Sequence, residues 1–252
     1  MKRAADFLLI DVSNSFTKFA FASRARVGPS RKVPTARLTE AFVRKILATR
    51  AASTLVISSV VPRRNAAISR AAGKSEVLWL NPSSRLNVRI DYPQPRSVGA
   101  DRLANAVAVT ELYGTPAIVI DFGTAVTFDI VSAQNAYIGG VIAPGLEAMT
   151  NFLYQRTALL PRLSLREPRS AIGKTTREAM LAGAIFGYRG LVREILRRVV
   201  AEEFARKRVH IVATGGYAEL LASKMPEVEA VQANLTLEGL RIVGCLNSGE
   251  RS

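Results

Sequence analysis

The sequence predicts an α/β protein built from two halves, and three observations indicate this fold class. A strand, a tight turn and a returning strand occur twice, at 7–18 and at 118–129. β-Branched runs alternate with stretches of helical periodicity, as in layered α/β folds. Gly114, Thr115 and Pro116 interrupt the chain between the two copies. We therefore expect one half over residues 1–114 and a second half over residues 115–252.

The repeat places an aspartate at the end of each opening strand. Aligning the copies puts Asp11 on Asp121 and Thr17 on Thr127, both at an offset of 110 residues (121 − 11 and 127 − 17). Internal repeats of this kind fix the architecture of a chain. Gly123 follows the second aspartate, where the absence of a Cβ lets backbone pass close to a ligand. Two such turns facing across a cleft can hold the phosphates and the metal ion of a nucleotide from both sides.

The remaining elements follow from periodicity and capping signals. In the first half we expect an edge strand within 24–35, a helix over 38–48 with Thr39 as N-cap, a strand over 55–61, a helix over 63–72, a strand over 76–80, a long loop over 81–98 and a helix over 99–113. In the second half we expect a glycine-rich segment over 137–145, a helix over 146–154, an irregular basic segment over 156–168, a long helix over 177–205, a strand over 208–214 and a closing helix over 236–246. Gly183, Gly187 and Gly190 are spaced so that another helix can pack closely on the long helix.

Composition places the protein among ordinary globular chains, with 48% hydrophobic and 22% charged residues. The lone Cys245 excludes an intramolecular disulfide and fits a reducing cytoplasm, where we expect the protein. The lone His210 lies in an apolar run, which favours a core histidine over a catalytic or zinc-binding one. No stretch resembles a signal peptide or a membrane span.

The net charge of +15 is the strongest argument for a nucleic-acid partner. The basic residues are scattered along the chain, however, without a dense run or interleaved aromatic residues. Such scatter is more typical of a compositional bias or of attraction towards polyphosphate substrates. We therefore expect no nucleic-acid partner.

Two further sites carry chemistry-bearing residues, each with a structural alternative. Asp101 and Arg102 open the predicted helix after the long loop. The aspartate either complements the helix dipole or accepts a proton while the arginine holds an anion at the helix N-terminus. Gly215 and Gly216 end a strand, either beside a nucleotide or as an ordinary turn. The chain has no Walker-type phosphate loop, no GxGxxG motif and no credible Ser–His–Asp arrangement.

Short motifs in order along nearly the whole chain resemble the type III pantothenate kinase family. The matching residues are Asp11-Val12-Ser13-Asn14-Ser15 with Lys18, Ser59-Val60-Val61-Pro62, Tyr92 before Gly99-Ala100-Asp101-Arg102, Asp121-Phe122-Gly123-Thr124-Ala125 with Thr127, Gly139-Gly140 with Pro144-Gly145, Ile172-Gly173 with Thr176, Thr214-Gly215-Gly216, and Leu237-Glu238-Gly239-Leu240. Each motif is weak alone, whereas the ordered set is highly specific.

The resemblance implies an actin-like fold of the acetate and sugar kinase type, with two ribonuclease-H-like halves and a nucleotide cleft between them. It implies phosphorylation of the primary hydroxyl of pantothenate by ATP to 4'-phosphopantothenate, the first step of coenzyme A biosynthesis. It also implies Mg²⁺ with ATP, a monovalent cation (K⁺ or NH₄⁺) and a homodimer.

The family's site residues carry over to matching positions. ATP would contact Asp11, Val12, Ser13, Asn14, Ser15, Phe16, Thr17, Lys18 and Thr124. Pantothenate would contact Tyr92, Gly99, Ala100, Asp101, Arg102 and Thr176, the last across the dimer interface. Asp101 would be the proton acceptor, Asp121 would hold K⁺, and Asp11 would hold Mg²⁺, partly through water.

One departure from the family pattern and three alternatives accompany this interpretation. Ser13 stands where the family turn usually has glycine, and its side chain could crowd a phosphate or force an unfavourable φ. The alternatives are a non-catalytic relative that regulates or binds nucleic acid, a kinase of the same fold for another small alcohol, and a two-metal nuclease. Only Asp11, Asp121 and Asp129 are placed for the nuclease.

Overall fold

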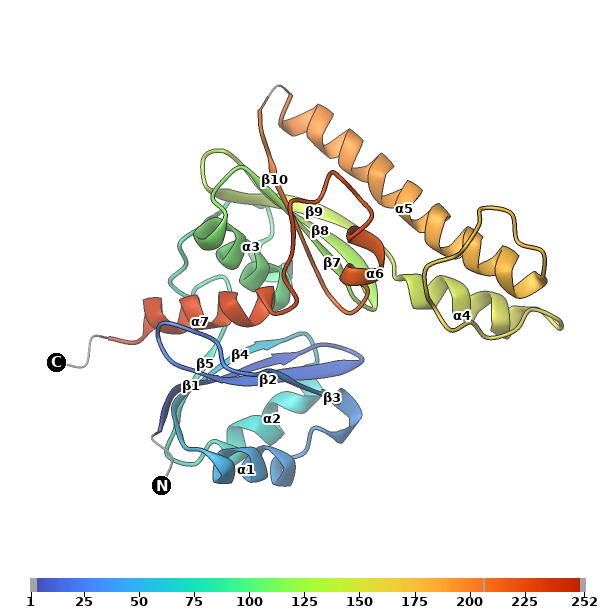
Figure 1. The fold of residues 1–252 in the computed structure, drawn as a ribbon. Coiled ribbons are helices and arrows are strands. Elements are labelled where there is room, and N and C mark those ends of the chain that lie inside the picture. The colour runs from blue at the N-terminus through green and yellow to red at the C-terminus, as the bar shows by residue number, and fades with distance from the viewer. Residues whose placement is uncertain (1–3, 206, 250–252) are drawn as a thin grey trace. The chain divides into compact units, whose positions relative to one another are not determined.

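The computed structural model describes residues 4–205 and 207–249, which form two compact units (Figure 1). Unit 1 comprises Met1–Gly114, Asn135–Ile138 and Asn234–Ser252, and unit 2 comprises Thr115–Gln134 and Gly139–Ala233. The first change of unit follows Gly114, and the closing helix groups with unit 1.

Unit 1 is built on a five-stranded sheet with the order β3-β2-β1-β4-β5. β1 runs antiparallel to β2 and parallel to β4, while β3 extends the antiparallel edge and β5 the parallel edge. The predicted edge strand within 24–35 is therefore confirmed. The strands are β1 (Ala5–Val12), β2 (Phe16–Ala22), β3 (Arg31–Pro34), β4 (Ala52–Ser59) and β5 (Glu76–Trp79).

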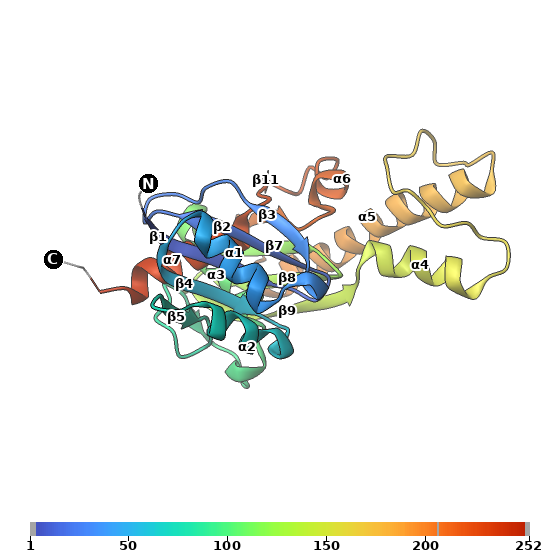
Figure 2. The same ribbon diagram turned by 90° about the horizontal axis from the view of Figure 1, so that it is seen from below.

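Helices cover both faces of this sheet. Figures 1 and 2 show α1 (Glu40–Thr49) and α2 (Pro62–Ala71) on one face, and α7 (Leu235–Asn247) on the other face with α3 (Ala100–Leu112) packed against it. The alternation along β1 explains this arrangement, because successive side chains point to opposite faces. Leu8 and Ile10 belong to the core cluster under α1 and α2. Phe7 instead lies against Gly244 of α7.

The helix starts follow the predicted signals. Thr39 caps α1, since its hydroxyl accepts a hydrogen bond from the backbone N–H of Phe42 (3.2 Å). Pro62 is the first residue of α2, where its missing N–H costs nothing. α7 belongs to unit 1 because its buried face packs on β1, β4 and α3. Gly239 permits this packing, since a Cβ there would overlap the backbone of Ala104.

The second sheet has the order β11-β10-β7-β8-β9-β6. Its strands are β7 (Ala117–Phe122), β8 (Ala125–Val131), β9 (Ala136–Pro144), β10 (His210–Thr214), β11 (Ala230–Val231) and β6 (Arg89–Ile90), the last paired with the first residues of β9. The helices of unit 2 are α4 (Leu146–Arg156), α5 (Thr176–Glu203) and α6 (Ala218–Ala222). Figures 1 and 2 both show α4 beside the first turns of α5, and the irregular segment 157–175 joins the two helices.

The structure corrects the sequence expectations in several places. β6, α6, β11 and a short 3-10 helix at Pro95–Ser97 were not predicted, because elements of two to five residues show no readable periodicity. His210 is not a core residue: its ring is partly exposed and its Nδ1 lies 2.8 Å from Oε2 of Glu229. Gly183, Gly187 and Gly190 face open space, so no described part of this chain packs on them. Among the described residues, no helix has the length and apolar character needed to cross a membrane.

Candidate nucleotide and substrate site

A polar row crosses the sheet of unit 1 at the end of β1. Asp11 pairs in register with Ser58 of β4 on one side and with Lys18 of β2 on the other, so these three side chains share one face of the sheet. Asp11 and Ser58 are buried. The hydroxyl of Ser58 has no hydrogen-bond partner among the described residues. We call Ser58, Asp11 and Lys18 the polar row; it places a hydroxyl and a carboxylate beside an ammonium group on one face of the sheet.

The turn that follows Asp11 is fixed from outside by Thr35. The Thr35 hydroxyl donates to the carbonyl of Ser13 (2.7 Å), and its backbone N–H donates to the carbonyl of Ser15 (3.0 Å). The hydroxyl of Thr17 lies 3.0 Å from that of Thr35. Sequence reasoning missed Thr35, which lies far along the chain and gives no local signal. The hydroxyl of Ser13 donates to Oδ2 of Asp11 (3.3 Å).

The backbone at Ser13 carries no left-handed strain. Among the described non-glycine residues, a positive φ occurs at Asn135 (φ 56°), a turn residue far along the chain. The expectation that serine would force an unfavourable φ at this turn is therefore wrong. The turn closes through the backbone N–H of Ser13, which donates to the carbonyl of Phe16 (3.2 Å).

Unit 2 repeats the arrangement around Asp121. This residue pairs with Thr214 of β10 on one side and with Thr127 of β8 on the other. The aligned aspartates are thus equivalent in the two sheets, but the predicted match of Thr17 with Thr127 is wrong by one residue. The first turn is one residue longer, so Thr127 occupies the place of Lys18.

The environment of Asp121 is suited to a monovalent cation. The hydroxyl of Thr214 is buried and has no hydrogen-bond partner among the described residues, and it lies beside the Asp121 carboxylate in register. Gly215 has φ +98°, and a Cβ there would lie 2.5 Å from Oδ1 of Asp121. Carboxylate and hydroxyl oxygens are ligands for hard cations. The residues present therefore fit a cation such as the K⁺ or NH₄⁺ that the resemblance implies.

Three backbone turns of unit 2 meet beside Asp121. The N–H of Gly145 donates to the carbonyl of Thr124 (3.2 Å), and a Cβ on Gly145 would overlap that carbonyl. The N–H of Tyr217 donates to the carbonyl of Phe122 (3.3 Å), and its hydroxyl donates to Oε2 of Glu147 (3.1 Å). Burial, and next the Glu147 carboxylate, raise the pKa of the Tyr217 hydroxyl. The glycine pair before Tyr217 thus forms part of one fixed cluster.

Asp101 lies in the first turn of α3 and folds back over Gly99. Its Oδ1 accepts a hydrogen bond from the N–H of Arg102 (2.9 Å). A Cβ on Gly99 would lie 2.5 Å from the same oxygen, so the glycine makes room for the carboxylate. Burial raises the pKa of Asp101 and outweighs the opposing effects of the Arg102 N–H and guanidinium. A carboxylate with a raised pKa is a better proton acceptor.

Two tyrosines lie beside this helix start. The rings of Tyr92 and Tyr137 meet edge to face with centroids 6.3 Å apart, and the guanidinium carbon of Arg102 lies 5.7 Å from the Tyr137 ring centroid. The pairing of Ile90 with Tyr137 brings the loop 81–98, which carries Tyr92, beside the start of α3. Tyr137 is fully buried and was not predicted, because a strand tyrosine reads as ordinary core. Within unit 1, the structure thus gathers Tyr92 with Gly99, Ala100, Asp101 and Arg102.

Thr176 is the first residue of α5 in unit 2 and is exposed. Thr175 caps the helix by accepting from the N–H of Glu178 (3.2 Å), and Glu178 in turn accepts from the N–H of Lys174 (2.9 Å). Gly173 lies where a Cβ would overlap the backbone of Ala179. The approach to Thr176 is therefore well defined. Among the described residues, no three His, Cys, Asp or Glu side chains lie close enough together to hold a metal ion as a group.

Solved structures define the class of fold. A Campylobacter jejuni protein described as a Baf family transcriptional activator matches with a TM-score of 0.62 at 18% identity, covering 94% of this chain and 96% of its own. A Listeria monocytogenes protein described as an N-acetylmannosamine kinase matches with a TM-score of 0.53 at 10% identity, covering 95% and 98%. With its two sheets, the chain has the fold of actin-like ATPases and sugar kinases.

Sequence relatives define the family within that class. A type III pantothenate kinase of Akkermansia muciniphila is 47% identical over 242 residues, covering 96% of this chain and 99% of the relative. One of Methylacidiphilum infernorum is 40% identical over 237 residues, covering 94% and 87%. The family model for type III pantothenate kinase matches residues 7–198. The chain belongs to the type III pantothenate kinase family.

Proposed function

We propose that this protein transfers the γ-phosphoryl group of ATP to the primary hydroxyl of pantothenate, giving 4'-phosphopantothenate in the first step of coenzyme A biosynthesis. Family membership supports this reaction. The observation that carries it is Asp101, a carboxylate of raised pKa held at a helix N-terminus beside Arg102. This pairing supplies a proton acceptor next to a cation, which phosphoryl transfer to an alcohol requires.

The chemical step assigns one role to each of these residues. Asp101 accepts the proton of the hydroxyl as its oxygen forms a bond to the γ-phosphorus. The bond from that phosphorus to the β–γ bridging oxygen breaks, and ADP leaves with the electron pair. Arg102 holds an anionic group, either the pantothenate carboxylate or the phosphoryl group in transfer. Tyr92, Gly99 and Ala100 line the pantothenate side.

The turn from Asp11 to Lys18, with Thr124, contacts ATP in this proposal. Lys18 neutralises phosphate charge, and turn N–H groups orient phosphate oxygens. Asp11 would hold Mg²⁺, partly through water, and the buried Ser58 hydroxyl beside it would offer a further oxygen. Mg²⁺ bound there would neutralise charge on the phosphates. Asp121 and Thr214 would hold K⁺ or NH₄⁺.

A homodimer is the proposed assembly, formed through what we call the α4–α5 surface. It consists of exposed apolar side chains on α4, α5 and the segment between them: Met149, Phe152, Leu153, Tyr154, Leu159, Ile172 and Phe186. The open glycine face of α5 lies on the same helix as Phe186. Large exposed apolar patches mark association sites. Thr176, at the start of α5, would reach the pantothenate of the partner subunit. A cytoplasmic location completes the proposal.

A coupled ADP-release assay tests the function. Purified protein would receive Mg·ATP and pantothenate, with K⁺ or with Na⁺ at equal ionic strength. We expect ADP release that requires pantothenate and is faster with K⁺. Other small primary alcohols serve as competing acceptors. Faster turnover with one of them would identify that alcohol, and not pantothenate, as the substrate. If well-folded protein released no ADP in response to any acceptor, the kinase assignment would be refuted.

A further inference from the structure

Lys32 of β3 continues the polar row by one strand, although no sequence signal marked it. Its register partner on β2 is Lys18, which is itself the partner of Asp11. Partners in register project to the same face of a sheet. Lys32 therefore shares the face of Asp11 and Lys18.

The side chain of Lys32 is directed towards the turn. Its Nζ lies 3.9 Å from the ring centroid of Phe16, the first residue of β2 after the turn. Phe16 is 42% exposed, so its ring offers a face to the ammonium group and contributes little to the core. A cation is thus held at the mouth of the turn, one strand beyond Lys18.

The neighbouring Arg31 provides an internal comparison. Its register partner is Phe19, whose ring packs on Phe42 of α1 with centroids 5.9 Å apart. Arg31 therefore belongs to the opposite face of the same strand. Arg31 and Lys32 are adjacent on the same edge strand but project to opposite faces of the sheet. Of the two, only Lys32 shares the face of the polar row.

We propose that Lys32 is a phosphate-binding residue for ATP, acting beside Lys18. The triphosphate of ATP carries several negative charges. Lys18 alone would neutralise only part of this charge, and the rest would be neutralised by the metal ion or screened by solvent. Lys32 supplies a second ammonium group as a point charge, which is how lysines bind phosphate. This inference rests on the proposed function only in taking ATP as the ligand.

The test is a comparison of ligand affinities by calorimetry with Mg²⁺ present. Lys32→Ala should weaken ATP binding roughly tenfold, the usual effect of losing one charged contact, and should leave adenosine affinity unchanged. Lys32→Arg should restore most of the ATP affinity. Arg31→Ala, which removes the same charge from the other face, should bind ATP as the unsubstituted chain does.

Four outcomes would overturn the inference. ATP affinity could be the same in Lys32→Ala as in the unsubstituted chain, which would show that Lys32 does not bind phosphate. ATP affinity could fall equally in Lys32→Ala and Arg31→Ala, which would indicate a general charge effect. Adenosine affinity could fall together with ATP affinity, which would indicate a structural role. The unsubstituted chain could fail to bind ATP. A chain that binds ATP but does not phosphorylate pantothenate would refute the proposed function and still decide the role of Lys32.

Discussion

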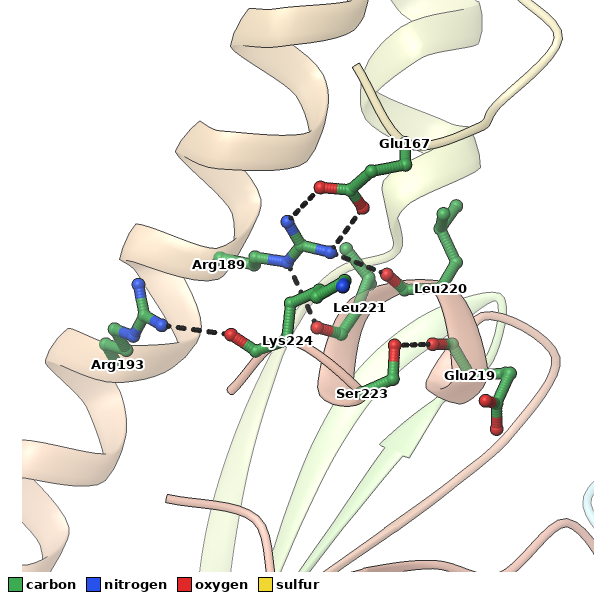
Figure 3. Close-up of polar contacts among 8 residues, drawn as sticks. All are labelled: Glu167, Arg189, Arg193, Glu219, Leu220, Leu221, Ser223 and Lys224. Atoms are coloured by element: carbon green, nitrogen blue, oxygen red, sulfur yellow. Dashed lines mark hydrogen bonds and ion pairs between the residues drawn. The ribbon is translucent and has the colours of Figure 1, made fainter. Parts of the chain in front are cut away.

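The guanidinium group of Arg189 holds the carboxylate of Glu167 by two parallel hydrogen bonds, from Nη1 to Oε1 (2.9 Å) and from Nη2 to Oε2 (2.7 Å) (Figure 3). The same group donates to the carbonyls of Leu221 (3.0 Å) and Leu220 (2.7 Å) at the end of α6. Arg189 is 5% exposed, so this contact is buried on the arginine side. One side chain of α5 thus joins the segment 157–175 to α6.

Replacing Arg189 by methionine should lower the free energy of unfolding by roughly 2–4 kcal/mol, because two carbonyls and a carboxylate lose their donor. Urea denaturation measures this change. Glu227→Gln is the control, since it breaks the exposed ion pair (3.0 Å) between Glu227 and Arg193, which lies on the same helix as Arg189. Its effect should stay below about 0.5 kcal/mol. Equal losses in the two variants would contradict a special role for the buried arginine.

Glu167→Gln should make the segment 157–175 more accessible to trypsin, which cleaves after Arg162, Arg166 and Arg169. Arg189 holds the pKa of Glu167 below its usual 4.5. The contact therefore contributes its full stability above pH 4.5 and loses it as the pH falls through the lowered pKa. Cleavage rates at neutral pH, compared by gel electrophoresis, check the prediction. Identical rates in the variant and the unsubstituted chain would show that the carboxylate does not restrain the segment.

Thr35→Val should weaken ATP binding roughly fivefold, because the turn carbonyl of Ser13 loses its side-chain donor while the fold keeps its shape. Thr39→Val is the control. It removes a comparable hydroxyl contact, the cap of α1, and should cost about 1 kcal/mol of stability without changing ATP affinity. Calorimetry and urea denaturation separate the two effects. A similar loss of ATP affinity in both variants would count against Thr35 as the residue that positions the turn.

Gly215→Ala should abolish the stimulation by K⁺. The new Cβ would lie 2.5 Å from Oδ1 of Asp121 and 2.6 Å from the backbone of Phe122, in a φ of +98°. The Asp121 carboxylate must then move. Gly73→Ala also places a side chain at a positive φ (+62°), but no atom lies within 4 Å of its Cβ. It should lose stability and keep its K⁺ response, and retention of that response in Gly215→Ala would argue against a cation site at Asp121.

The raised pKa of Asp101 should appear in the pH dependence of kcat/KM for pantothenate. Only the ionised carboxylate accepts a proton, so activity falls as the pH drops through this pKa. Burial raises it above the ordinary 3.8, which moves the acid limb of the profile to higher pH. Circular dichroism over the same range shows that the chain stays folded. An acid limb at or below pH 3.8 would contradict the buried environment of Asp101.

The sequence predicted the two-unit α/β architecture because long strands and helices carry strong periodic signals. It also placed the aspartates of both repeats, since each follows an unbroken apolar strand. It failed where the information is not local. α7 returns to unit 1 through packing, and the one-residue difference between the two turns appears only in strand register.

The same distinction holds for the candidate site. Motifs mark Asp11, Asp101 and Asp121, so the sequence alone could predict them as candidates. Thr35 and Tyr137 were missed because their roles arise from contacts with segments far away in the chain. Ser58 and Thr214 owe their positions to parallel pairing with the aspartates, which the sequence does not display.

The most direct test of the account is the rate of pantothenate phosphorylation by Asp101→Asn, with the product identified by mass spectrometry. The substitution keeps the shape of the side chain and removes its ability to accept a proton. We predict a kcat at least about 100-fold lower, with ATP affinity unchanged and the same circular dichroism spectrum. Undiminished phosphorylation by Asp101→Asn would contradict the assignment of Asp101 as the proton acceptor.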